Sequence, residues 1–194
     1  MALSERFEDA LVYAARLHAK QTRKGSGIPY VAHLLATASI VIEYGGAEDE
    51  AIAALLHDAV EDQGGAPTRE KIRQRFGERV AEIVDGCTDA DTVPKPPWRK
   101  RKEDYIAHIG GASASVRLVS AADKLHNARA ILKDYRLRGE SLWDEFNGGR
   151  EGTLWYYRSL VEAFKAAGTN PLVEELARVV AEIERLASAR GEDS

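Results

Sequence analysis

Two pairs of polar residues interrupt the apolar segment 51–65. His57 and Asp58 come first, and Glu61 and Asp62 follow one helical turn later. On a helix, residues four positions apart project from the same side, so the two pairs can share one pocket. Burying carboxylates costs free energy unless a cation or hydrogen bonds compensate. The segment therefore predicts a metal site, although an isolated His-Asp pair is also common on helix surfaces.

Two ligands are too few for such a site, so others must come from elsewhere in the chain. The candidates are His33 and Asp123, because each interrupts an apolar helical face. Imidazole and carboxylate groups together suit a borderline divalent cation, and hydrolytic metal sites keep positions open for water and substrate. The predicted ligand set is His33, His57, Asp58 and Asp123.

The elements that must position these residues are predicted to be helices. Apolar residues recur at helical spacing nearly throughout, and clusters of glycine and proline separate about eight to ten segments. Ser4, Thr68 and Asn170 are predicted N-caps, and residues 88–98 are predicted to form a surface loop. We expect an all-α protein with a single domain over residues 1–194, a core at about 4–165 and a C-terminal helix at about 171–190.

Composition limits the classes of partner and location. The chain has 27 Lys and Arg against 31 Asp and Glu, and its net charge of -4 gives no overall attraction to nucleic acid or an anionic membrane. The lone Cys87 excludes an internal disulfide and favours a reducing compartment. The sequence shows no membrane span or signal peptide. We therefore expect a cytoplasmic protein that binds a small molecule, with its oligomeric state open.

Three segments resemble motifs of a known family. They are RKGSGIPYVAH (23–33), ALLHDAVED (54–62) and AADKLHNAR (121–129). In this order they resemble the HD superfamily of metal-dependent phosphohydrolases. Within it they resemble the alarmone-hydrolase branch, which comprises the RelA/SpoT hydrolase domain and the small Mesh1-like alarmone hydrolases. The resemblance implies Mn²⁺-dependent hydrolysis of the 3′-pyrophosphate of ppGpp or pppGpp, which leaves GDP or GTP.

The resemblance also implies roles for individual residues. The four predicted ligands match the family's manganese ligands, and Glu61 and Asp62 match the acidic pair of its hydrolytically active members. The matching substrate contacts are Arg23 and Lys24 near the guanine base and Asn127 near the sugar. Basic side chains that could meet the substrate phosphates are Arg101, Lys102 and Lys124. Ala130 departs from the family, because many members have a threonine there.

Two other functions remain open from the sequence. A nucleotide phosphatase could use the same metal chemistry on the 2′-phosphate of NADPH or on a 5′-nucleotide, because the metal does not identify the leaving group. A nucleotide sensor could bind in the same pocket without turnover. Glu61 and Asp62 argue against the sensor, since a sensor needs no water-activating pair.

Overall fold

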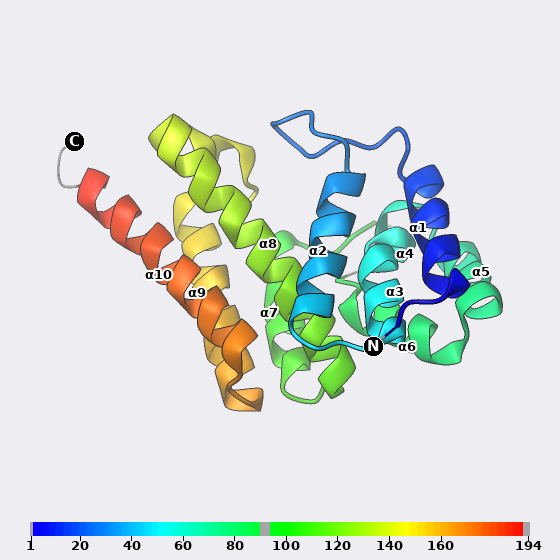
Figure 1. The fold of residues 1–194 in the computed structure, drawn as a ribbon. Coiled ribbons are helices and arrows are strands. Elements are labelled where there is room, and N and C mark those ends of the chain that lie inside the picture. Colours follow the sequence, from blue (N-terminus) through cyan, green and yellow to red (C-terminus); the bar gives the residue numbers. More distant parts are fainter. Residues whose placement is uncertain (1, 90–93, 192–194) are drawn as a thin grey trace. The chain divides into compact units, whose positions relative to one another are not determined.

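The described residues of the computed structural model, 2–89 and 94–191, form helices and contain no β-strand (Figure 1). This confirms the predicted all-α fold. The helices are α1 (Glu5–Leu17), α2 (Val31–Glu43), α3 (Glu48–Leu56), α4 (Ala59–Asp62), α5 (Ala66–Phe76), α6 (Glu78–Cys87), α7 (Trp98–Ile109), α8 (Ala114–Arg138), the 3-10 helix η1 (Gly139–Glu145), α9 (Gly149–Ala167) and α10 (Pro171–Gly191). None of them is long and apolar enough to cross a membrane.

Contacts divide the chain into two compact units. The first contains residues up to 96 together with 112–123, and the second contains 97–111 and the residues from 124 onward. Helix α8 contributes its beginning to the first unit and its remainder to the second. All four predicted metal ligands belong to the first unit. The predicted single domain over 1–194 stays a prediction.

The core of the first unit is built around α3, which packs against α1, α2 and α6 (Figure 1). Residues 51–56 of α3 are apolar and fully buried, so this part of the helix is surrounded by the core on all sides. Leu34 and Val41 of α2 are buried with it. The predicted N-cap Ser4 starts α1, where its hydroxyl accepts a hydrogen bond from the Arg6 amide. A helix so deeply buried holds the residues at its end in fixed positions.

Helix α8 approaches α6 closely, which sets the position of Asp123. A Cβ atom on Gly86 would lie 2.5 Å from Cγ2 of Val116, so only glycine allows this approach. One turn further along α8, the Ser120 hydroxyl lies 3.6 Å from the Cys87 sulfur. Asp123 follows on the same helix.

The second unit packs α9 against both α7 and α10. Its buried side chains include Tyr135, Trp143, Leu160 and Phe164, so aromatic residues from this part of the chain belong to the core. An apolar stripe of α10 is also buried, at Val173, Leu176, Val180, Ile183 and Ala187.

The helix caps were predicted only in part. The Asn170 side chain accepts a hydrogen bond from the Val173 amide, which confirms it as the cap of α10. The predicted cap Thr68 is wrong, because Gly65 precedes α5 and Thr68 lies inside its first turn. There the Thr68 hydroxyl donates to the Gln63 carbonyl instead. The predicted surface loop at 88–98 lies partly outside the described residues.

Candidate metal centre

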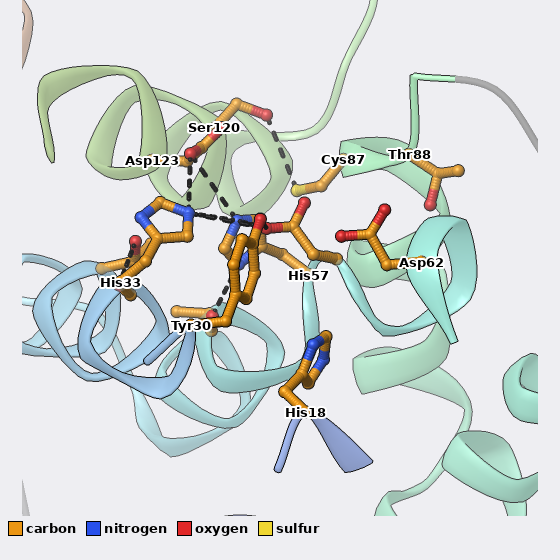
Figure 2. Close-up of polar contacts among 12 residues, drawn as sticks. His18, Tyr30, His33, His57, Asp62, Cys87, Thr88, Ser120 and Asp123 are labelled. Carbon is orange, nitrogen blue, oxygen red and sulfur yellow. Dashed lines mark hydrogen bonds and ion pairs between the residues drawn. The ribbon is translucent and has the colours of Figure 1, made fainter. Parts of the chain in front are cut away.

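The four predicted ligands converge on one point of the first unit (Figure 2). His33 comes from the first turn of α2, His57 from the end of α3, Asp58 from the turn after it, and Asp123 from α8. Both imidazoles are buried, with 1% and 2% of their side chains exposed. Asp58 keeps 22% of its side chain exposed, so the cluster is open to small molecules on that side.

The distances in this cluster fit a single cation. His33 Nε2 lies 3.3 Å from His57 Nε2, 3.5 Å from Asp58 Oδ2 and 3.2 Å from Asp123 Oδ1. His57 Nε2 lies 3.0 Å from Asp58 Oδ2 and 3.6 Å from Asp123 Oδ1. Ligand atoms about 2.1 Å from a common ion, at octahedral or tetrahedral angles, are about 3.0 to 3.4 Å apart. Three of the five separations fall in this range and the other two, 3.5 and 3.6 Å, lie just above it, so the cluster has about the size that one ion needs.

The protonation of the two histidines also suits a cation. His57 Nδ1 lies 2.8 Å from the Ala54 carbonyl oxygen and donates to it, so Nε2 can offer a lone pair. A second imidazole Nε2 faces this lone pair at 3.3 Å, which is unfavourable unless a proton or a cation lies between the two nitrogens. Among the described residues, His33, His57 and Asp58 form the group with metal-ligand spacing.

The carboxylates give the cluster a strong attraction for positive charge. Burial by itself lowers the pKa of His57, but the charge of Asp58 and the hydrogen bond to Asp123 outweigh it and hold that pKa well above its ordinary value. Burial also disfavours the charged form of Asp58 and so raises its pKa. The charge of His57 and the hydrogen bond to His33 outweigh burial and hold the pKa of Asp58 well below its usual range. Asp58 is therefore ionised and available as a ligand.

Tyr30 fixes the orientation of one carboxylate in this cluster. Its hydroxyl donates to Asp58 Oδ2 at 2.6 Å. Burial raises the pKa of Tyr30 well above its ordinary value, and the Asp58 charge raises it further, so the phenol keeps its proton and acts as a donor. Such outer hydrogen bonds orient metal ligands and tune their basicity.

The acidic pair lies next to the cluster on a short separate helix. We predicted that Glu61 and Asp62 continue the helix of His57 and Asp58. The structure corrects this: α3 ends at Leu56, and Asp58 turns the chain at φ -95° and ψ -2° before α4 begins. In Figure 2 the Asp62 carboxylate points toward the cluster. The charge of Asp58 contributes to a raised pKa of Asp62, after the larger effect of burial.

Comparison with known proteins agrees with this geometry. The family model described as HD domain matches residues 10–154, which is most of the chain. The chain belongs to the HD-domain family. An HD domain implies a divalent metal ion, and the donor set of two imidazoles and two carboxylates fits such an ion.

Named relatives of this HD-domain chain align with most of its residues. The guanosine-3′,5′-bis(diphosphate) 3′-pyrophosphohydrolase MESH1 of Xenopus tropicalis is 36% identical over 170 residues, which cover 86% of this chain and 87% of that protein. The MESH1 of Homo sapiens is 36% identical over 63% of this chain and 68% of its own length. A solved structure titled as a metazoan ortholog of SpoT that hydrolyses ppGpp has a TM-score of 0.76, 26% identity and 98% coverage of both chains.

The predicted substrate contacts of the HD domain lie in both units. Arg23 and Lys24 belong to the first unit, between α1 and α2, and the Arg23 guanidinium lies 5.9 Å from the centre of the Tyr30 ring. Arg101, Lys102, Lys124 and Asn127 belong to the second unit. There, the ammonium groups of Lys102 and Lys124 face aromatic rings, at 4.9 Å from Tyr156 and 4.8 Å from Tyr105. Their roles in substrate binding stay predictions.

Sequence reasoning missed three residues around the cluster. Tyr30 was visible only as part of a motif, because nothing in its spacing indicates a hydrogen bond to Asp58. Gln21 donates to Asp62, and the buried His18 contacts Gln21. The signal that could have found them is polarity: His18 and Gln21 are polar residues at the end of an amphipathic helix.

Replacing Tyr30 with phenylalanine tests the outer hydrogen bond. The variant keeps the ring but loses the donor to Asp58, so we expect Mn²⁺ affinity to fall ~10- to 100-fold, as is typical of outer partners of metal ligands. Isothermal titration of the metal-free protein with Mn²⁺ measures this change. Tyr44→Phe removes a hydroxyl at the far end of α2 and serves as the control. Equal affinities of the Tyr30→Phe variant and the parent protein would contradict the role of Tyr30.

Proposed function

We propose that this HD-domain chain is a Mn²⁺-dependent hydrolase that removes the 3′-pyrophosphate of guanosine alarmones such as ppGpp. The observation that carries the proposal is the convergence of His33, His57, Asp58 and Asp123, with the Asp62 carboxylate directed toward them (Figure 2). The names of the relatives support the choice of substrate, since MESH1 proteins are named for this reaction and match most of this chain.

The acidic pair would prepare the attacking water. A bound divalent cation makes water acidic enough to lose a proton near neutral pH and offsets charge on the phosphoryl oxygens. Asp62 would accept a proton from that water and orient a lone pair of the water oxygen toward phosphorus. Glu61 is held in place by Lys95, whose ammonium lies 2.6 Å from Glu61 Oε1. Attack at the phosphorus joined to the 3′ oxygen would break the bond between these two atoms and release pyrophosphate, and the 3′ oxygen would take up a proton to leave GDP.

The basic pair would bind the nucleotide in the first unit. Arg23 presents a planar guanidinium above the Tyr30 ring, and Tyr30 itself contacts Asp58. A group stacked near Arg23 would therefore lie within a few side chains of the metal ligands. Lys24 is exposed beside it and can meet a phosphate as a point charge. This arrangement supports a guanine nucleotide as the small-molecule partner. We also propose a cytoplasmic location, where such nucleotides are made and consumed.

Products distinguish this proposal from a phosphatase. We expect the purified protein with Mn²⁺ to convert ppGpp into GDP and pyrophosphate, with no orthophosphate when pyrophosphatase is excluded. A parallel reaction with NADPH tests phosphomonoester cleavage, which would yield NADH and orthophosphate. Ion-exchange chromatography separates the nucleotides, and ³¹P NMR identifies the phosphate products. Intact ppGpp together with rapid dephosphorylation of NADPH would contradict the proposal, and turnover of neither substrate would favour the sensor.

A further inference from the structure

Gln21, in the turn that follows α1, is hydrogen-bonded to Asp62 of the acidic pair. The amide nitrogen Nε2 of Gln21 donates to Asp62 Oδ2 at 2.8 Å. The amide oxygen Oε1 of the same residue lies 2.6 Å from Nδ1 of His18 and 2.5 Å from Nε2 of Gln63. Gln21 thus joins three side chains, of which only Asp62 belongs to the proposed catalytic machinery.

This network fixes which way the Gln21 amide points. The Asp62 carboxylate can only accept, so Gln21 must present its NH₂ group on that side and its oxygen toward Gln63 and His18. His18 Nδ1 then donates to the same oxygen, which leaves the Gln21 NH₂ group for the Asp62 carboxylate. A flipped amide would set its NH₂ against the Gln63 NH₂ and its oxygen against a carboxylate oxygen. The neighbouring groups therefore favour the orientation in which Gln21 donates a hydrogen bond to Asp62.

His18 is the buried end of this hydrogen-bond network. It is 2% exposed, and its ring stacks on Tyr30 with 5.4 Å between centroids and 18° between planes. Its Nε2 has no hydrogen-bond partner among the described residues, so its polar bond inside the fold is the one to Gln21. Tyr30 in turn donates to Asp58. The stacked pair His18 and Tyr30 therefore supports a carboxylate on each side of the site: Asp58 directly and Asp62 through Gln21.

We propose that Gln21 is a positioning residue that holds the Asp62 carboxylate toward the metal cluster for its work on the attacking water. The inference rests on the proposed hydrolytic function, and it requires only that Asp62 takes part in turnover. Asp58 and Glu61 are negative neighbours that repel the charge of Asp62, and the Gln21 amide offsets part of this repulsion together with the charge of Lys95. With its Oδ2 bound to Gln21, the carboxylate keeps its other oxygen for water.

Removing the amide tests the proposal. We expect Gln21→Leu to lower kcat ~10- to 100-fold while KM and Mn²⁺ content stay at parent values, by analogy with lost outer hydrogen bonds at metal sites. Gln74→Leu is the matched control, because Gln74 Nε2 also donates to a carboxylate oxygen, that of Glu70, at 2.8 Å on exposed helix α5. The control should keep the parent kcat.

A double-mutant cycle separates positioning from a general structural role. If Gln21 acts through Asp62, then Gln21→Leu should change kcat less than about twofold in an Asp62→Asn background, because the partner is already inactive. An equal loss of kcat in both backgrounds, or unchanged kcat in the single variant, would overturn the proposal. The cycle is run on whichever of ppGpp and NADPH the parent protein cleaves. Cleavage of NADPH alone therefore contradicts the alarmone proposal and still tests Gln21, whereas turnover of neither contradicts both.

Discussion

Alanine at His57 or Asp58 is expected to abolish metal binding and turnover together. His57 Nε2 lies close to three other ligand atoms and Asp58 Oδ2 close to two, and His57 is held by the Ala54 carbonyl in the tautomer that a metal needs. A metal ion supplies several kcal/mol of transition-state stabilisation, so the rate should fall by ~10³-fold or more. Mass spectrometry of the purified variants measures the metal content, and the ppGpp assay measures the rate.

Folding must be retained for that result to have meaning. His108 and Asp9 are exposed residues outside the cluster, and alanine at either position should leave metal content and rate unchanged. Circular dichroism should show the parent helix content in all four variants. The substitutions at His57 and Asp58 remove polar side chains from the cluster but leave the apolar core around α3 in place. Full metal occupancy in both His57→Ala and Asp58→Ala would exclude these residues as ligands.

Amide substitutions in the acidic pair should separate chemistry from metal binding. Asp62→Asn and Glu61→Gln keep the shape of each side chain but lose the proton acceptor, and neither residue is among the four converging ligands. General acid-base assistance typically contributes ~10²- to 10⁴-fold, so we expect kcat to fall by that factor while Mn²⁺ content is unchanged. The larger loss should come from Asp62, because the Glu61 carboxylate is already engaged by Lys95.

The same assay includes its own control. Glu82 is an exposed acid on α6, and Glu82→Gln should keep the parent kcat. Near-parent rates in both Asp62→Asn and Glu61→Gln would show that another group handles the attacking water. A loss of Mn²⁺ in either variant would instead place that carboxylate among the ligands.

The fold and the ligand set could be predicted because the helices show a periodic pattern of apolar residues and the ligands interrupt that pattern. Helices reveal themselves by the spacing of apolar residues, and α3 is apolar from residue 51 to 56 before His57 interrupts it. Polar groups that interrupt a buried helix need compensation, which is why His33 and Asp123 could be chosen from separate segments. The structure brings both within 3.6 Å of His57 Nε2.

The supporting residues could not be predicted, because their roles depend on tertiary distances. Nothing in the spacing of Gln21 and Asp62 shows that they meet across 41 positions of sequence. The break between α3 and α4 was missed for a different reason: α3 ends at Leu56 and α4 begins at Ala59, while the apolar pattern continues through Ala59 and Val60. Threonine is a residue type that often caps helices, but Gly65 and not Thr68 occupies the cap position of α5, at a positive φ of 61°.

Hydrolysis of ppGpp in water enriched with ¹⁸O tests the central claim most directly. If the cluster directs water to the phosphorus joined to the 3′ oxygen, the solvent oxygen must appear in pyrophosphate, and GDP must keep its original 3′ oxygen. Mass spectrometry of both products, with Mn²⁺ as the only divalent ion, gives the answer. The account predicts labelled pyrophosphate and unlabelled GDP. Label in GDP, or release of labelled orthophosphate in place of pyrophosphate, would contradict it.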